Sequence, residues 1–311
     1  MTTIKMMSLK KAASQIAVSL VAFAACQPDN DILNSVDVQN VNSELASAAM
    51  ISENSEISAA VISGLTNTMY AGARIAADTF KNLSFKDPRL TCATDTLIRT
   101  GTTNAPAGVI IIDFGTSGTC SDSRGVTRKG KIKITYAGKR WAPGSSFTME
   151  LINFFRNGAS IEGTEKLTFV SSIDTLHLML TDTLKGGKVT FGDGKTINRD
   201  HTLTKTWYRF INSSTNQIDP LRNESHIEGS ATGKTKNGNA YAMNTITPLV
   251  QKLSCWISNK VFIPVSGKKN VTITSTGETY TIDYGDGTCD NQIVVSKNEK
   301  AKTITVTADG N

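Results

Sequence analysis

Alternation of apolar and polar residues dominates the chain from about Leu90 onward, and it constrains the fold more than any other feature. Clear examples are residues 131–136 (KIKITY) and 302–306 (KTITV), with Gly, Asn and Asp between such segments. Strict alternation places one face of each strand on a core and the other in water, which is typical of antiparallel sheets. Strands do not alternate with helical segments, so a doubly wound parallel sheet is not expected. The sequence predicts a mainly β body over residues 86–311, an antiparallel sheet or sandwich.

An internal repeat lies within this body, with one copy at about residues 90–136 and another at about 253–306. Each copy runs from a Leu-x-Cys tripeptide through Ile-Asp-Phe/Tyr-Gly and Gly-Thr-Cys into an alternating strand. Between the copies, Ile161-Glu162-Gly163 and Ile227-Glu228-Gly229 echo each other. The period is too long for a short-repeat solenoid, and it predicts repeated strand–hairpin units in one sheet system.

Four cysteines belong to the two repeat copies: Cys92, Cys120, Cys255 and Cys289. Four cysteines allow three pairings, and their matched positions favour one bridge within each copy, Cys92–Cys120 and Cys255–Cys289. Free thiols are the alternative. A zinc site would need close Cys-x-x-Cys spacing or neighbouring histidines, and the cysteines have neither, so we expect no metal on them.

The N-terminal 25 residues have the pattern of a secretory signal peptide. Lys5, Lys10 and Lys11 precede an apolar run from Ile16 to Ala25, which is too short to span a bilayer as a helix. The ending Phe-Ala-Ala-Cys resembles the bacterial lipobox, in which the chain is cut before a cysteine that then carries acyl chains. We therefore expect Cys26 to be lipidated, with palmitate-type chains holding the protein on a membrane. The alternative is ordinary cleavage nearby, which leaves Cys26 a plain thiol.

Charge divides the rest of the chain into two unequal parts. Residues 26–73 contain six acidic residues and no Lys or Arg, whereas residues 74–311 contain 30 Lys and Arg against 21 Asp and Glu. We expect residues 26–42 to be an acidic tether and residues 43–85 a helical element, formed by two helices or one broken helix. A basic body suits anionic glycans or lipid headgroups, although the charges can simply face solvent. Export makes nucleic acid an unexpected partner.

The order of the IDFG, GTC and GKIKITY motifs, followed by IDYGDGTCDN, resembles a family of uncharacterised lipoproteins of the Bacteroidota. The resemblance covers about residues 85–311 and is carried mainly by the two cysteine motifs. It implies attachment to the cell outer membrane and an all-β body. It brings no catalytic residues, because no activity is established for that family.

Motifs for common enzyme classes are absent from the sequence. His177, His201 and His226 are scattered, His177 in an alternating strand and His201 in an expected loop, and no His-Glu-x-x-His or Gly-x-Ser-x-Gly occurs. Asp283, Asp286 and Asp290 lack the alternate spacing of an EF-hand loop. We therefore expect no catalytic site, cofactor or metal. A paired-carboxylate glycosidase needs no local motif and stays open.

Trp207 and Tyr208 end a strand-like run and are the candidate residues for stacking on a sugar, whereas Trp256 follows Cys255 and is expected in the core. Together these features predict a lipid-anchored envelope protein with a non-catalytic binding or structural role toward a glycan or an envelope or matrix protein. The alternatives are a glycan-degrading enzyme whose carboxylates the sequence does not identify, and a periplasmic chaperone or lipid carrier. Orientation toward the cell surface or the periplasm stays open.

Overall fold

The computed structural model describes residues 35–306 except 66–77, 84, 86, 173, 175, 260 and 262. All of these belong to one compact unit, Ile32–Asn311. The expected signal peptide, Cys26 and the first part of the tether lie outside the described residues. No helix in the described part of the chain is both long enough and apolar enough to cross a membrane.

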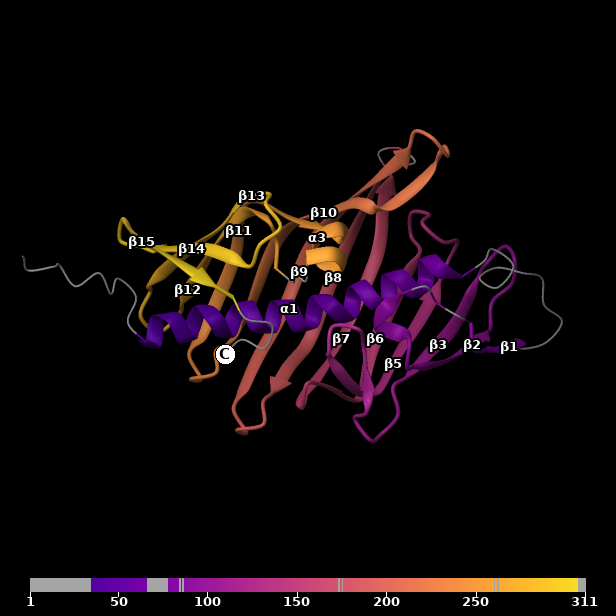
Figure 1. Ribbon diagram of the computed structural model, residues 1–311, viewed down its shortest axis with the longest axis horizontal. Helices are drawn as coiled ribbons and strands as arrows, with labels where there is room; N and C mark the ends of the chain where they lie inside the picture. Colours follow the sequence, from indigo (N-terminus) through magenta and orange to yellow (C-terminus); the bar gives the residue numbers. More distant parts are fainter. Residues whose placement is uncertain are drawn as a thin grey trace, which may run out of the picture. The chain divides into compact units, whose positions relative to one another are not determined.

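Fifteen strands of the described chain form one antiparallel meander (Figure 1). Each strand pairs with the next along the chain, except that β3 pairs with β5 and the short β4 pairs only with β5. The mainly β prediction is confirmed, and the sheet is single. The strands are β1 (Asp78–Lys81), β2 (Thr94–Arg99), β3 (Ala107–Asp113), β4 (Cys120–Ser121), β5 (Thr127–Ala137), β6 (Ser146–Arg156), β7 (Ala159–Ser172), β8 (His177–Thr190), β9 (Thr196–Asn212), β10 (Gln217–Lys234), β11 (Ala240–Lys252), β12 (Ser266–Ile273), β13 (Thr279–Asp286), β14 (Gln292–Lys297) and β15 (Lys300–Thr305).

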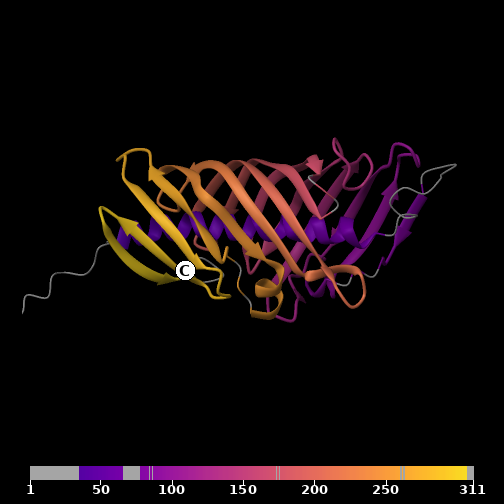
Figure 2. The same cartoon turned by 90° about the horizontal axis from the view of Figure 1, so that it is seen from above.

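One long helix, α1 (Ser35–Gly64), crosses the strands along the length of the sheet (Figures 1 and 2). It is a single unbroken helix, not the two helices or broken helix that we expected. It also begins within the segment 26–42, which corrects the tether prediction for residues 35–42. Strand β1 (Asp78–Lys81) likewise corrects the helical prediction near the end of segment 43–85. Asp37 in the first turn suits the positive end of the helix dipole.

The sheet curls around α1, as sheets of more than about ten strands commonly do. From residue 37 to residue 62, every side chain of α1 is buried or half-buried. The later part of the helix packs in a core with β2–β9, and Val41 and Leu45 pack in a second core with β9–β14. Buried serines of α1 satisfy their hydroxyls within the helix, as in the bonds from Ser43 to the Gln39 carbonyl and from Ser58 to the Asn54 carbonyl. A polar helix can therefore lie largely buried against the sheet.

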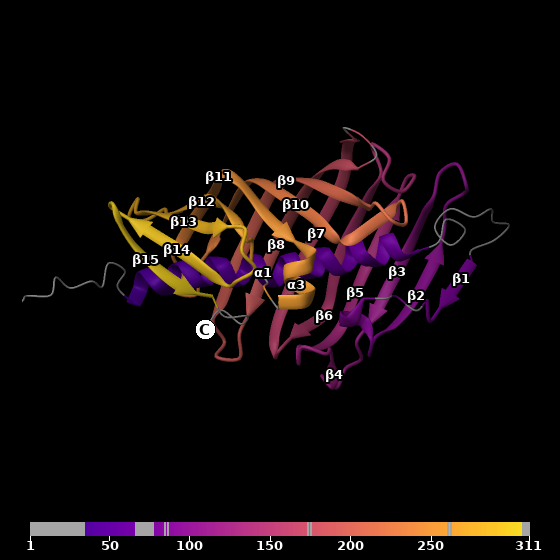
Figure 3. The same ribbon diagram turned by 45° about the horizontal axis from the view of Figure 1, so that its top comes forward.

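Both expected disulfides are present, Cys92–Cys120 and Cys255–Cys289. Each joins a short helical segment to the chain just after a hairpin, where Cys120 lies in β4 and Cys289 lies in the connection after β13. Cys92 lies just after the 3-10 helix η1 (Pro88–Leu90), and Cys255 lies in α3 (Leu253–Asn259). The two copies of the sequence repeat are thus equivalent units, with hairpins β2–β3 and β12–β13, placed toward opposite ends of the sheet (Figure 3).

The repeated Ile-Glu-Gly tripeptide marks two β-bulges. Gly163 and Gly229 both have a φ of 134°, and the strand register shifts at each of them. Only glycine adopts this backbone region readily. The bulges increase local twist and bend the long strands β7 and β10, which helps the sheet to wrap around α1.

Replacing Gly229 with alanine is expected to lower the free energy of unfolding by at least about 2 kcal/mol. The new methyl group would lie 2.4 Å from the Thr202 carbonyl oxygen and 2.9 Å from Leu203 Cα, in a backbone conformation that strains alanine. Urea unfolding of the variant measures the change. Gly192→Ala is the control, because a Cβ at Gly192 meets no atom within 4 Å. Equal effects at both glycines would show that the bulge does not require glycine.

Candidate functional site

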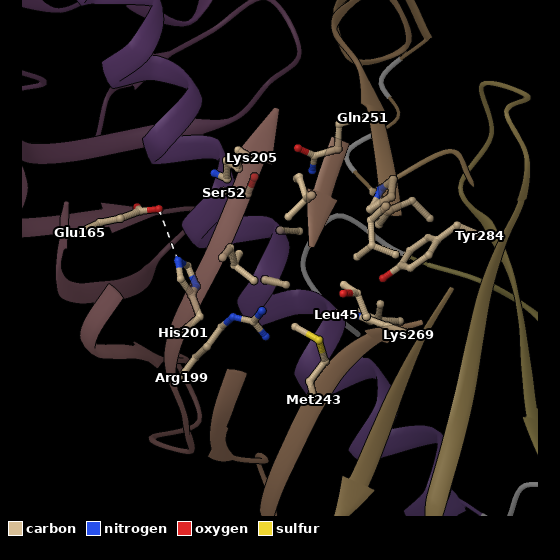
Figure 4. Close-up of a pocket in the computed structure, with 18 residues that line it drawn as sticks. Leu45, Ser52, Glu165, Arg199, His201, Lys205, Met243, Gln251, Lys269 and Tyr284 are labelled. Carbon is tan, nitrogen blue, oxygen red and sulfur yellow. Dashed lines mark ion pairs between the residues drawn. The ribbon is translucent and has the colours of Figure 1, made fainter. Parts of the chain in front are cut away.

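A cavity of about 60 Å³ lies between α1 and the inner face of the sheet (Figure 4). Its walls are mainly apolar and come from α1, strands β9–β11 and the segment at Ile263 and Pro264. Charged side chains from β7, β9 and β12 meet its other side. The space is large enough for a few water molecules but is far below the roughly 300–1,000 Å³ of ordinary small-molecule sites.

Four ionisable side chains from three neighbouring strands form the central cluster: Glu165 on β7, Asp182 on β8, and His201 and Lys205 on β9. None is more than 7% exposed. His201 Nε2 lies 3.2 Å from Asp182 Oδ1 and 3.7 Å from Glu165 Oε1, and Lys205 Nζ lies 2.7 Å from Asp182 Oδ2. Glu165, His201 and Lys205 also line the cavity. A carboxyl group, an imidazole and an ammonium group are therefore all buried next to a space with room for water.

Strand pairing explains why the three carboxyl and imidazole groups meet. Glu165 pairs with Leu184 of β8, and Leu184 pairs in turn with His201 of β9. Asp182 is two residues before Leu184 and therefore faces the same side of the sheet, diagonally between the other two. All three side chains point toward α1 from consecutive strands.

Burial gives the members of the central cluster different protonation states. Burial and the neighbouring Asp182 raise the pKa of Glu165 well above its ordinary value. Burial would also raise the pKa of Asp182, but Lys205 and His201 outweigh it and hold that pKa below its usual range. Burial lowers the pKa of His201. The two carboxyl groups of the cluster thus differ in acidity, and Glu165 holds its proton more tightly than Asp182 does.

Replacing Glu165 with glutamine is expected to stabilise the folded protein at pH 8 relative to the wild type. Because the folded-state pKa is raised above the unfolded value of about 4.3, wild-type stability is lost as pH rises from there through the folded pKa. Glutamine does not titrate, so the two proteins should be equally stable near pH 4 and diverge above it. Chemical unfolding at several pH values measures this. A variant that is less stable at pH 8 would show that Glu165 is charged in the folded protein.

Two further charge clusters flank the central one and fix α1 to the sheet. Glu53 of α1 pairs with Arg128 and Arg156, both at 2.5 Å, and with Arg124 at 2.9 Å. Burial would raise the pKa of Glu53, but the arginines outweigh it and hold that pKa far below its usual range. Glu44 pairs at 2.5 Å with Arg199 and Lys269. Burial would raise the pKa of Glu44 as well, but these two cations outweigh it and lower that pKa. The acidic helix is therefore neutralised by basic side chains inside the sheet, which accounts for part of the charge asymmetry in the sequence.

The two aromatic residues expected to stack on a ligand face opposite sides of β9. Trp207 lies on the inner side, half-buried, with its ring centroid 5.7 Å from that of Trp141 and 5.8 Å from that of Phe169. Tyr208 lies on the outer side, with its centroid 4.2 Å from that of His226. Successive residues of a strand alternate in direction, so these two rings cannot form one stacking surface.

Trp256 is half-buried rather than enclosed in a core. Its ring lies on α3 with the Arg89 guanidinium 4.2 Å from the ring centroid. Arg124, which pairs with Glu53, lies 5.7 Å from the same centroid. Trp256 therefore covers the edge of the Glu53 cluster, and this gives α3 a contact with the first repeat copy.

The aspartates near the second cysteine motif serve local turns. Asp283, Asp286 and Asp290 each accept a hydrogen bond from the backbone N–H two residues further on. These carboxylates thus have partners nearby, and Asp283 also pairs with Lys268 of β12 at 2.8 Å. Among the described residues, the grouping of potential metal ligands is elsewhere, at Glu165, Asp182 and His201.

His201 corrects the sequence prediction, because it lies within strand β9 and not in a loop. The sequence carried a signal for the whole cluster, which is the presence of charged residues at inward positions of alternating strands. Asp182 stands between Leu180 and Leu184, which are both buried, and Leu203 stands between His201 and Lys205. The alternation alone assigns these positions to the core, and charged residues in a core need partners.

Comparisons with protein-family models, with curated proteins and with solved structures found no match to this chain.

Proposed function

We propose that this chain is a lipid-anchored protein of the bacterial cell envelope whose β body has a non-catalytic binding or structural role. The anchor rests on the sequence alone, namely the apolar run that ends at Cys26. Cys26 precedes the first residue of α1 by only nine positions, so an acylated Cys26 would hold the body close to the membrane surface. The partner class that suits such a body is a glycan or another protein of the envelope.

The observation that carries the non-catalytic role is that α1 fills the interior of the sheet. The cavity beside the central cluster has a volume of only about 60 Å³, and the carboxyl groups of Glu165 and Asp182 are both 0% exposed. A separate, more polar hollow of about 220 Å³ is lined by residues that include Phe85, Leu90 and Ile112 and does not include this carboxyl pair. A glycosidase needs two carboxyl groups that flank a sugar in an open cleft. This pair is sealed, which favours a binding or structural role over the glycan-degrading alternative.

A lipid carrier needs an apolar space the length of an acyl chain. The cavity beside α1 has apolar walls, but its volume suits a few water molecules. Moving α1 away from the sheet to make more room would separate Glu44 and Glu53 from their buried cations. The ion pairs of α1 therefore favour a fixed helix over a carrier that opens.

Replacing Cys26 with alanine tests the anchor. We expect the wild-type protein to fractionate with outer membranes and to incorporate an alkyne-labelled fatty acid, and the variant to lose both properties. A Cys92→Ala/Cys120→Ala variant is the control, because it removes thiols that the structure places in a disulfide. A Cys26→Ala protein that remains on membranes with unchanged mass would overturn the lipid anchor. Protease treatment of intact and lysed cells then determines whether the body faces outward.

A further inference from the structure

The spacing of three side chains in the central cluster matches the ligand shell of a small transition-metal ion. Zinc ligands at about 2.0–2.2 Å in tetrahedral geometry lie about 3.3–3.6 Å from one another. His201 Nε2 is 3.2 Å from Asp182 Oδ1 and 3.7 Å from Glu165 Oε1, and the three ligand atoms all lie within 4.8 Å of one another. A nitrogen and two carboxylate oxygens are a usual donor set for zinc.

Glu165 is the observation that points to a missing ligand. Its side chain is 0% exposed, and its polar neighbours are the Asp182 carboxyl group, the Ser55 hydroxyl and His201, none of which reaches its oxygens with strict hydrogen-bond geometry. Figure 4 shows this carboxyl group directed toward His201. A buried carboxyl group with such poorly aligned neighbours is costly, and a coordinated cation satisfies its oxygens more completely than they do.

The charges around the three residues also suit a divalent cation. Glu56 of α1 lies close enough to Lys205 and Asp182 to interact with both electrostatically. Glu56, Glu165 and Asp182 are three carboxyl groups with one ammonium group, that of Lys205, among them. Fully ionised, these four residues carry two negative charges in excess, which one divalent cation neutralises.

Lys205 does not occupy the position between the three ligands. It binds Asp182 Oδ2, whereas Asp182 Oδ1 faces His201. Contacts of this kind to the second oxygen of a carboxylate orient metal ligands in proteins. The cavity reaches both Glu165 and His201, and it leaves room for a water molecule as a fourth ligand.

We propose that Glu165, Asp182 and His201 form a buried site for one zinc-type divalent cation that joins strands β7, β8 and β9 beneath α1. This site is independent of the lipid anchor and of any partner on the protein surface. It would add to the stability of the folded chain, because the unfolded chain does not bring the three ligands together.

The test uses the full chain, purified in detergent and stripped of metal with a chelator. Zn²⁺ is titrated by calorimetry and Co²⁺ by visible absorption, for the wild type and for Glu165→Gln and His201→Gln. Glu162→Gln is the matched control, because Glu162 lies on the same strand, is exposed and pairs with Lys188. We expect one Zn²⁺ per chain, a raised thermal midpoint, tetrahedral Co²⁺ bands, and affinity more than about 100-fold weaker in the two ligand variants but unchanged in the control.

Two results would overturn the proposal: no stoichiometric uptake by the wild type, or uptake that Glu165→Gln and His201→Gln leave unchanged. X-ray absorption of the zinc-loaded wild type gives a readout that does not depend on variants folding. One nitrogen ligand with oxygen ligands supports the site. Sulfur ligands, or oxygen ligands alone, would contradict it.

Discussion

Replacing Glu53 with glutamine is expected to lower the free energy of unfolding by about 3–5 kcal/mol, the usual cost of removing one partner from a buried ion pair. Glu53 is 3% exposed and pairs with Arg128 and Arg156 at 2.5 Å. Glutamine fills the same space, but it leaves the guanidinium groups buried with less negative charge. Guanidinium unfolding monitored by tryptophan fluorescence measures the loss.

The pH dependence of this effect has a definite sign. The pKa of Glu53 lies below its unfolded value, so its contribution is present above about pH 4.3 and is lost as pH falls through the folded pKa. The deficit of the Glu53→Gln variant should therefore be complete at pH 7 and shrink in acid. Glu162→Gln, an exposed glutamate, should change stability by less than about 0.5 kcal/mol. A Glu53→Gln variant within 1 kcal/mol of wild type at pH 7 would contradict the neutralising role of Glu53.

Removing the second disulfide by Cys255→Ser and Cys289→Ser is expected to destabilise the protein by about 4 kcal/mol in the chain-entropy model. The bridge spans a sequence separation of 34 residues and joins α3 to the connection after β13, so it constrains the unfolded chain strongly. The loss should appear as a lower unfolding midpoint in denaturant. Under reducing conditions, which open both bridges, the wild type and the variant should have the same stability.

The first disulfide provides the matched comparison. Cys92–Cys120 spans 28 residues, and removing it should cost about as much, since the model depends only on the logarithm of loop length. The two losses should be nearly equal if both copies of the repeat contribute equivalently. Two observations together would show that the bridges are absent. One is a count of two or more free thiols in the unreduced wild type, and the other is unchanged stability in both cysteine variants.

The β body and its bridges were predictable because their signals are local. Alternation of apolar and polar residues in segments such as 131–136 indicates a strand with one buried face. This indication does not depend on which strands are its neighbours. The repeated cysteine motifs placed Cys92 with Cys120 and Cys255 with Cys289 because each pair stands at matching points of a repeat copy. The strands and the disulfide pairs can both be predicted without knowing how the sheet curls.

The helix boundary was not predictable in the same way. Residues 35–42 are polar and rich in Asn and Val, so their sequence favours a solvated tether over a packed helix. Their helix is stabilised by tertiary contacts, with Val41 fully buried and Asn40 bonded through its side chain to Asn239. The sheet that encloses α1 is distant in sequence, and composition alone does not reveal it.

The central cluster was missed because its members come from three strands. Asp182 and His201 are 19 residues apart, and no short motif joins them. The available signal was a charged residue at an inward position, as for Asp182 between two buried leucines. That signal marks a residue that needs a partner, and the partner becomes known only when the strand register is known.

Hydrogen exchange of α1 in the full chain tests most directly whether this helix is a fixed part of the interior. We expect amides of residues 40–62 to exchange only when the whole body unfolds, with protection equal to that of the central strands β7–β9. Glu53→Gln should reduce the protection of α1 and of these strands by the same amount. Exchange of α1 through a separate opening, while β7–β9 stay protected, would contradict an ion-paired helix locked within the sheet.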